Sequence, residues 1–263
     1  MPELKQSPSP PLGDAAGRPL ACTNRLLAAL GSVVQQRLQE HTRIVHAQEI
    51  LFDASQPQFN IYFPNGNTVI SLVRGTDEGP QVEVGLIGSE GFANLDLLLT
   101  GAVHDDTLMI VQAAGEVTCI AAARLQSEFS TDARTRVLIN GYAAMFLEHV
   151  SQTAVCNGVH SVVQRLSKWM LELRDRTGSN ELQVSHESLS RILGTQRPAV
   201  TLAIGALTVM GVISHSRRSI YVRDPEGLRT RACGCFELMQ RSLTDFRVQL
   251  WNRKQESARQ NAG

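Results

Sequence analysis

This chain of 263 residues lacks several features that mark other classes of protein. No apolar run approaches the roughly 18 residues that a membrane-spanning helix needs. The N-terminus has no basic start followed by an apolar stretch, so no secretory signal is visible. Cysteine is sparse and scattered rather than spaced as a disulfide framework, which is typical of a reducing compartment. The five cysteines are Cys22, Cys119, Cys156, Cys233 and Cys235. These features predict a cytoplasmic protein.

Net charge is absent overall but not locally. The chain has 25 basic and 25 acidic residues. Residues 1–157 hold 9 Lys or Arg and 16 Asp or Glu, which gives −7, whereas residues 158–263 hold 16 and 9, which gives +7. A basic C-terminal part behind an acidic N-terminal part indicates a nucleic-acid partner for one part only.

Residues 185–210 have the pattern of a DNA-binding helix-turn-helix. Ser185 is a favourable N-cap, and Gly194 allows the tight turn that ends the first helix. A second helix begins near Gln196, with Pro198 in its first turn. Apolar residues recur at helical spacing in both helices, at Leu189, Ile192 and Leu193 and then at Val200, Ala203, Ile204 and Leu207. The alternative is an ordinary helical hairpin without a role in DNA binding.

The polar N-terminal end of the second helix is the part that such motifs insert into a major groove. The predicted base-reading residues are Gln196, Arg197, Thr201 and Leu202. Arg197 can donate to O6 and N7 of guanine, and Leu202 can contact a thymine methyl group. The predicted phosphate contacts are Ser185, His186, Thr195, Ser216, Arg217 and Arg218.

Residues 211–222 predict a β-hairpin directly after the second helix, which makes the motif winged. Arg217 and Arg218 fall at its tip, where long cations suit phosphate contact. A solvated turn is the alternative. Asp224 and Pro225 then predict the start of a C-terminal helix.

Residues 42–121 predict a small antiparallel β-barrel or jelly roll. Glycine-containing turns separate short β-prone runs at 43–46, 50–52, 59–63, 69–73, 82–87, 108–112 and 117–120. Histidine occurs in this region only at His46 and His104, with no His-x-His, so a cupin-like metal enzyme is disfavoured. No phosphate-binding loop or nucleophile motif is present either. We therefore expect a protein that is not an enzyme.

A helix over residues 131–157 is predicted to be about 40 Å long and is apolar on more than one side. Both apolar sides of such a helix must be buried, one by its own domain and the other by a further element. The simplest such element is the same helix of a second subunit. The predicted dimer contacts are Ile139, Ala143, Phe146, Val150 and Thr153. The alternative is an internal core helix. Asn157 and Gly158 predict a helix break, which we interpret as an interdomain hinge.

These patterns give an α+β chain in five segments. Residues 1–20, rich in Pro, Ser and Gly, predict a disordered lead-in. A sensor β-barrel domain at 21–130 opens with a helix over 21–40. The dimerisation helix at 131–157, a winged helix-turn-helix at 158–235 and a C-terminal helical extension at 236–263 follow.

An acidic barrel, a long two-faced helix, a hinge and a basic winged helix-turn-helix occur together in the Crp/Fnr superfamily of bacterial transcription regulators. The chain resembles them over about residues 25–235, most strongly in Ser-His-Glu-Ser-Leu at 185–189, Leu-Gly-Thr at 193–195 and Gly-Val-Ile at 211–213. In the barrel, Ile61-Tyr62-Phe63-Pro64 and Gly88-Ser89-Glu90-Gly91 look like one branch of that superfamily. The resemblance implies a homodimer that binds a palindromic operator in double-stranded DNA and works with RNA polymerase.

The cyclic-nucleotide-binding-like barrel departs from members that bind cyclic AMP. Their Gly-Glu pair aligns near Ala93-Asn94, and their phosphate-binding Arg aligns near His104-Asp105-Asp106. Two carboxylates there repel a phosphate. We expect no cyclic AMP or cyclic GMP binding of the usual kind, and the effector stays unknown.

Other known sensing groups of the superfamily lack their residues here. Only Cys22 precedes the barrel, so an iron–sulfur cluster lacks ligands. Cys233-Gly234-Cys235 suits neither the usual zinc spacing nor an easy disulfide, which favours a packing role, with thiol redox sensing as the alternative. A haem could use His46, His104 or His149, but no spacing selects one of them. We therefore expect no metal and no cofactor.

The second helix also departs from the best-known pattern of Arg, Glu and a second Arg four residues on. Arg197 matches the first, but Pro198 and Leu202 replace the others. The operator is therefore expected to differ from the usual Crp/Fnr half-site. A scaffold that has kept the winged fold and lost DNA affinity is a further alternative, against which Arg197, Arg217, Arg218 and the basic domain argue.

Overall fold

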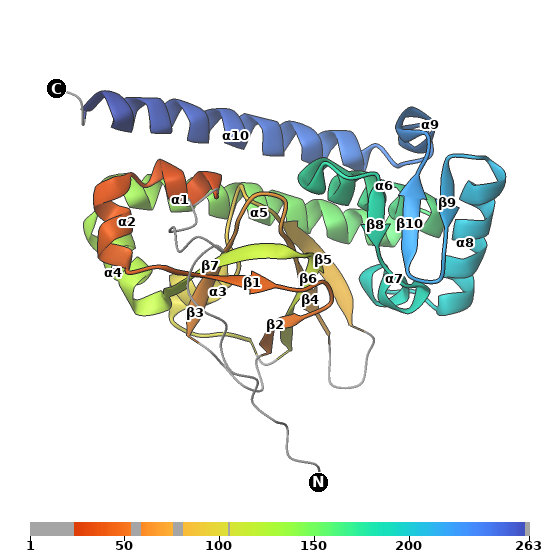
Figure 1. Ribbon diagram of the computed structural model, residues 1–263, viewed down its shortest axis with the longest axis horizontal. Coiled ribbons are helices and arrows are strands. Elements are labelled where there is room, and N and C mark those ends of the chain that lie inside the picture. Colours follow the sequence, from red (N-terminus) through yellow and green to blue (C-terminus); the bar gives the residue numbers. More distant parts are fainter. Residues whose placement is uncertain (1–23, 54–58, 76–80, 105, 261–263) are drawn as a thin grey trace, which may run out of the picture.

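The computed structural model describes residues 24–53, 59–75, 81–104 and 106–260 (Figure 1). The predicted lead-in over 1–20 lies outside the described residues. In the part that is described, no single helix is long and apolar enough to cross a membrane. Among the described helices, one pair would be long and apolar enough together, α7 and α8, which are bent by 108° relative to each other.

Two antiparallel sheets form the barrel, and all seven expected strands are present. One sheet has the order β1-β7-β3, from β1 (His41–Val45), β7 (Gly115–Ala121) and β3 (Asn60–Pro64). The other has the order β2-β6-β4-β5, from β2 (Ile50–Asp53), β6 (Thr107–Ala113), β4 (Val69–Arg74) and β5 (Val82–Ile87). The predicted α+β class and the antiparallel barrel are confirmed.

The helical lead into the barrel is interrupted, unlike the single helix expected over 21–40. The helix α1 (Arg25–Ala29) begins at Asn24, whose side chain accepts a hydrogen bond from the Leu27 amide at 2.9 Å. Gly31, with φ of +84°, then separates it from α2 (Ser32–Leu38). That backbone conformation is favourable for glycine and ends a helix. Two further helices, α3 (Leu95–Thr100) and α4 (Ala122–Thr131), complete the domain.

The long helix is present as α5 (Ala133–Val159), but the expected break at Asn157-Gly158 is wrong. Both residues are helical, and the break lies two residues later, at His160. A glycine costs a helix only about 1 kcal/mol relative to alanine, so it does not end one by itself. The boundary is set instead by Ser161, which forms a capping box with Gln164 and begins α6 (Val162–Thr177).

The predicted winged helix-turn-helix is confirmed. It consists of α7 (His186–Ile192), α8 (Arg197–Val209) and the hairpin of β9 (Ile213–His215) and β10 (Ser219–Val222). A third strand, β8 (Glu181–Gln183), was not expected and pairs with β10 to give the order β8-β10-β9. The core of this domain gathers apolar residues from α6, α7, α8 and the sheet.

The C-terminal segment forms two helices rather than one. Asp224 caps the short α9 (Pro225–Arg229), and α10 (Cys235–Gln260) follows. The helix α10 runs back from the winged domain along α5 and reaches α1 (Figure 1). Its residues Leu243, Phe246 and Leu250 are buried in the same core as the barrel, so this helix joins the two domains.

Candidate nucleic-acid interface

A serine cap begins α7, and a glycine shapes the turn between α7 and α8. The Ser185 hydroxyl accepts a hydrogen bond from the Ser188 amide at 3.1 Å, which starts α7. Gly194 has φ of +54°, a conformation that favours glycine. A Cβ atom there would lie 2.7 Å from Cγ2 of Val82 on β5, so the turn also packs directly on the barrel. Glycine is therefore favoured at this position for two independent reasons.

The four predicted base-reading residues lie on the exposed side of the start of α8. Gln196 is its N-cap and Arg197 its first residue. Thr201 and Leu202 follow on the same face, and the Leu202 side chain is 75% exposed. Because Val200 and Ile204 are buried against α7, the exposed face presents the predicted readers outward.

A concavity of about 650 Å³ lies between α7, the start of α8 and the tip of the wing. It brings together five of the six predicted phosphate contacts with one predicted reader, namely Ser185, His186, Ser216, Arg217 and Arg218 with Arg197. Thr195 is outside this lining and lies in the turn, where its amide donates to the Ser190 carbonyl oxygen at 3.0 Å. His186 and Arg217, which are 31 positions apart in the sequence, thus lie on one surface.

The concavity is suited to an anion. Arg197, Arg217 and Arg218 are exposed, and within the described part of the chain none of them is in an ion pair. Glu187 is the one carboxylate among the lining residues. Partial burial, with smaller contributions from neighbouring His215 and Arg197, lowers the pKa of His186. Its positive charge is therefore disfavoured, and it contributes a hydrogen-bonding ring, 3.2 Å from the Thr201 hydroxyl.

Three of the five predicted dimer contacts of α5 are buried within the single subunit. Ile139, Phe146 and Thr153 are buried within the subunit itself, and the Phe146 ring lies against Gly85 of β5. Ala143 and Val150 are partly buried and line an open pocket of the barrel, which Leu147 lines as well. Ile139, Phe146 and Thr153 are therefore covered by their own subunit, whereas Ala143 and Val150 stay partly accessible.

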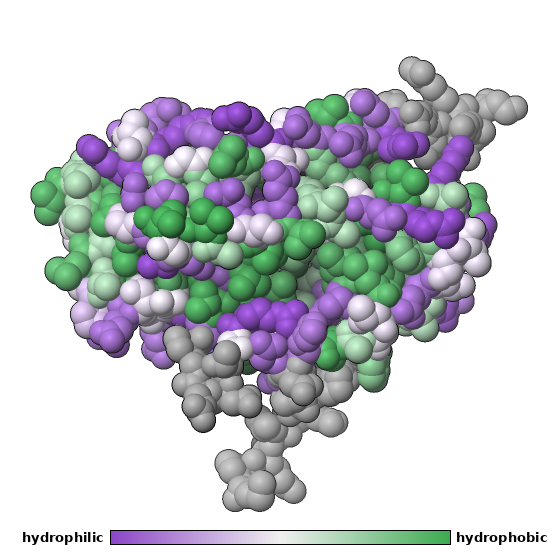
Figure 2. Space-filling model, turned by 180° about the vertical axis from the view of Figure 1, so that it is seen from behind, coloured by the Kyte–Doolittle hydropathy of each residue, from purple (hydrophilic) through white to green (hydrophobic). Residues whose placement is uncertain are grey.

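A different row of α5 residues is exposed, and we name it the exposed stripe. It recurs every three or four residues at Val137, Asn140, Ala144, Leu147, Ser151, Ala154 and Gly158. The Leu147 side chain is 67% exposed and that of Val137 is 53% exposed. On the side of the molecule opposite to the view of Figure 1, hydrophobic residues gather across the middle of the surface (Figure 2). The spacing is that of a coiled-coil seam.

The barrel contains a mainly apolar pocket of about 400 Å³ between its strands β4, β5 and β6 and helices α3 and α5. Asn94, at the position aligned with the cyclic-AMP-binding pair, is among its lining residues. Arg74 also lines it but is paired with Asp96 at 3.3 Å and with Asp106 at 3.0 Å. The guanidinium at this pocket is thus already neutralised by two carboxylates.

A buried polar contact joins the barrel to α6, and sequence reasoning did not find it. Glu83 of β5 accepts a hydrogen bond from the Trp169 indole at 3.0 Å and another from Ser71. Burial raises the pKa of Glu83 to about 8, and the two hydrogen bonds offset only part of this effect. Nearby, Glu90 pairs with Arg176 at 3.0 Å and with Arg247 of α10 at 3.3 Å.

Replacing Glu83 with glutamine is expected to stabilise the protein relative to the wild type as the pH rises. The ordinary carboxyl pKa is 4.5 and that of buried Glu83 is about 8, so unfolding releases a proton between these values. The stability contributed by protonated Glu83 is fully present below pH 4.5 and is lost as the pH rises to about 8. Glutamine keeps the Trp169 bond and does not titrate. Over pH 5–8 its advantage should grow by about 1 kcal/mol per pH unit, measured by denaturant unfolding. A difference that stays constant with pH contradicts this assignment.

Comparison with known proteins shows one domain match and several similar solved structures. Residues 164–231 match the Crp-like helix-turn-helix domain. A putative transcriptional regulator of the Crp/Fnr family from Eubacterium rectale is 18% identical, with a TM-score of 0.62 over 78% of this chain and 96% of that chain. FixK2 from Bradyrhizobium japonicum is 16% identical, with a TM-score of 0.62 over 75% and 99%. The c-di-GMP responsive regulator CLP from Xanthomonas campestris is 19% identical, with a TM-score of 0.58 over 75% and 96%. The comparison with curated proteins gave no match.

Proposed function

The chain has the Crp/Fnr fold, and its residues 164–231 match a Crp-like helix-turn-helix domain. We propose that the protein is a transcription regulator that binds a palindromic operator as a homodimer. The observation that carries the proposal is the cationic concavity beside the start of α8. It places phosphate-binding groups of the wing next to the exposed reading face, as a winged motif on duplex DNA requires.

The exposed stripe of α5 supports a dimer formed by a second copy of the chain. Its small residues Ala144, Ser151 and Gly158 allow two helices to approach closely, and Leu147 supplies apolar contact between them. A helix-to-helix contact about a two-fold axis is isologous, so the same residues serve both subunits. The two α8 helices would then enter successive major grooves about 34 Å apart.

Selection from a pool of random duplexes tests the DNA-binding part of the proposal. The purified full-length chain should enrich a two-fold symmetric site, and its affinity for that site should exceed that for scrambled DNA by at least about 10³-fold at moderate salt. A scaffold without DNA affinity would enrich no sequence. Enrichment of a single, non-repeated half-site would support DNA binding and contradict the dimer.

We propose that the barrel responds to a signal other than cyclic AMP. The pocket is mainly apolar, and its Arg74 is held by two carboxylates, so a phosphate finds no free cation there. Titration calorimetry with cyclic AMP is expected to show no binding at micromolar concentrations, and heat of binding in that range contradicts the proposal.

A regulator of this kind would act with RNA polymerase, without catalysis of its own. The four free cysteines of the described chain fit a reducing cytoplasm.

A further inference from the structure

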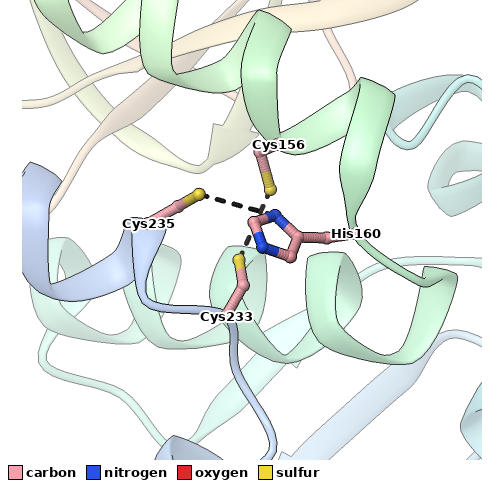
Figure 3. Close-up of side chains that lie close together, drawn as sticks. All are labelled: Cys156, His160, Cys233 and Cys235. Atoms are coloured by element: carbon pink, nitrogen blue, oxygen red, sulfur yellow. Dashed lines mark hydrogen bonds between the residues drawn. The ribbon is translucent and has the colours of Figure 1, made fainter.

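Three cysteines and one histidine meet where α5 ends and α10 begins. Cys156 lies in the last turn of α5 and His160 at its C-cap, so the two are one helical turn apart. Cys233 precedes α10 and Cys235 is its first residue. All four side chains point toward one another (Figure 3). We call this group the Cys₃His cluster.

The distances in the Cys₃His cluster match the coordination shell of one metal ion. The Sγ atoms of Cys156 and Cys233 are 3.4 Å apart, and Sγ of Cys235 is 3.6 Å from Nδ1 of His160. All four ligand atoms lie within 4.8 Å of one another. Tetrahedral zinc, with bonds of about 2.3 Å to sulfur and about 2.0 Å to nitrogen, requires ligand separations of about 3.5–3.8 Å.

The surroundings of the cluster resemble those of a buried metal site. The three cysteines are buried and form a group separate from both apolar cores. The side-chain amide of Gln152 donates to Sγ of Cys235 at 3.0 Å, as an outer partner of a metal ligand would.

We propose that the Cys₃His cluster binds a single Zn²⁺ ion, which joins the end of α5 to the start of α10. Three thiolates and one imidazole are a ligand set of structural zinc sites, and they leave no position open for a substrate. An iron–sulfur cubane holds its cysteines around a body of eight atoms, so its sulfurs lie further apart than these. The expectation of a packing role for Cys233 and Cys235 took no account of Cys156 and His160.

Metal analysis of the full-length chain, purified without chelators, tests the proposal. One zinc ion per chain is expected in the wild type, and almost none in the Cys233→Ser, Cys235→Ser double variant. The matched control is Cys119→Ser, which removes a buried cysteine of β7 outside the cluster and should keep the full amount of zinc.

A second measurement does not depend on the double variant folding. Cobalt(II) added to the metal-free wild type should give thiolate charge-transfer absorption and the strong visible bands of a tetrahedral site. His160→Cys should keep the ion and shift the visible bands, because four thiolates also close a tetrahedron. Absence of zinc and cobalt binding by folded protein with free thiols overturns the proposal. A Cys156–Cys233 disulfide in the purified chain, seen as a mass lower by two hydrogens, does so as well.

Discussion

Replacing Leu147 with glutamate is expected to convert the protein into a monomer and to weaken operator binding by at least about 100-fold. Leu147 is 67% exposed at the middle of the exposed stripe, so in a two-fold dimer two new carboxylates would face each other across the axis. Like charges without water between them are strongly disfavoured. A monomer also loses the linkage of its two half-sites, which is worth 10² to 10⁴ in affinity as an order of magnitude. Sedimentation velocity and titration of the selected operator measure the two effects.

The matched control is Ile44→Glu, because Ile44 is an apolar residue of β1 with 58% exposure and lies outside the stripe. It introduces the same charge and should leave both the dimer and operator affinity unchanged. A Leu147→Glu protein that sediments as a dimer would remove the stripe from the proposed interface. Loss of the dimer in both variants would point to a general effect of charge.

Replacing Arg197 with alanine is expected to relax sequence preference at one symmetric position of the operator. Arg197 is exposed at the first residue of α8, outside any ion pair of the described chain, so its guanidinium is available for a guanine edge. A bidentate contact of this kind discriminates by about 1–3 kcal/mol, or about 5- to 150-fold. Repeating the duplex selection with the variant measures this, and an unchanged preference would exclude Arg197 from base readout.

An arginine of the wing, Arg217, provides the control variant for Arg197→Ala. Arg217→Ala, at the tip of the β9–β10 hairpin, should weaken binding to all sequences alike. It should also reduce the slope of log affinity against log salt by about 0.9, the value for one lost phosphate contact. If Arg197→Ala and Arg217→Ala behave identically, base readout and phosphate contact are not divided between helix and wing as proposed.

Local patterns were sufficient to predict most of the fold. Turn residues and alternation placed all seven barrel strands, and the Ser185 cap with Gly194 placed the helix-turn-helix. The phase of α5 could not be obtained in this way. Ile139 and Phe146 pack in the subunit's own core, which includes α10, whereas the exposed stripe combines small residues with Val137 and Leu147. Sequence periodicity shows how many sides are apolar, not which side the subunit covers itself.

The functional residues also fall into those that local sequence predicts and those that only the fold brings together. The reading face and the wing follow from residues close together in the chain, so their placement could be predicted. Cys156 and Cys233 are 77 residues apart, and Glu83 and Trp169 are 86 apart. Only the return of α10 and the docking of α6 on β5 bring these groups together. The Cys156-x₃-His160 spacing, one helical turn, was the one available signal beside Cys233-Gly234-Cys235.

The contact between Val82 and Gly194 links the barrel directly to the turn before α8. Val84, two residues along the same strand and so about 7 Å away, lines the barrel pocket. A molecule that fills this pocket would displace a strand that already touches the turn between α7 and α8. We expect the orientation of α8 to respond to such a displacement within a single subunit.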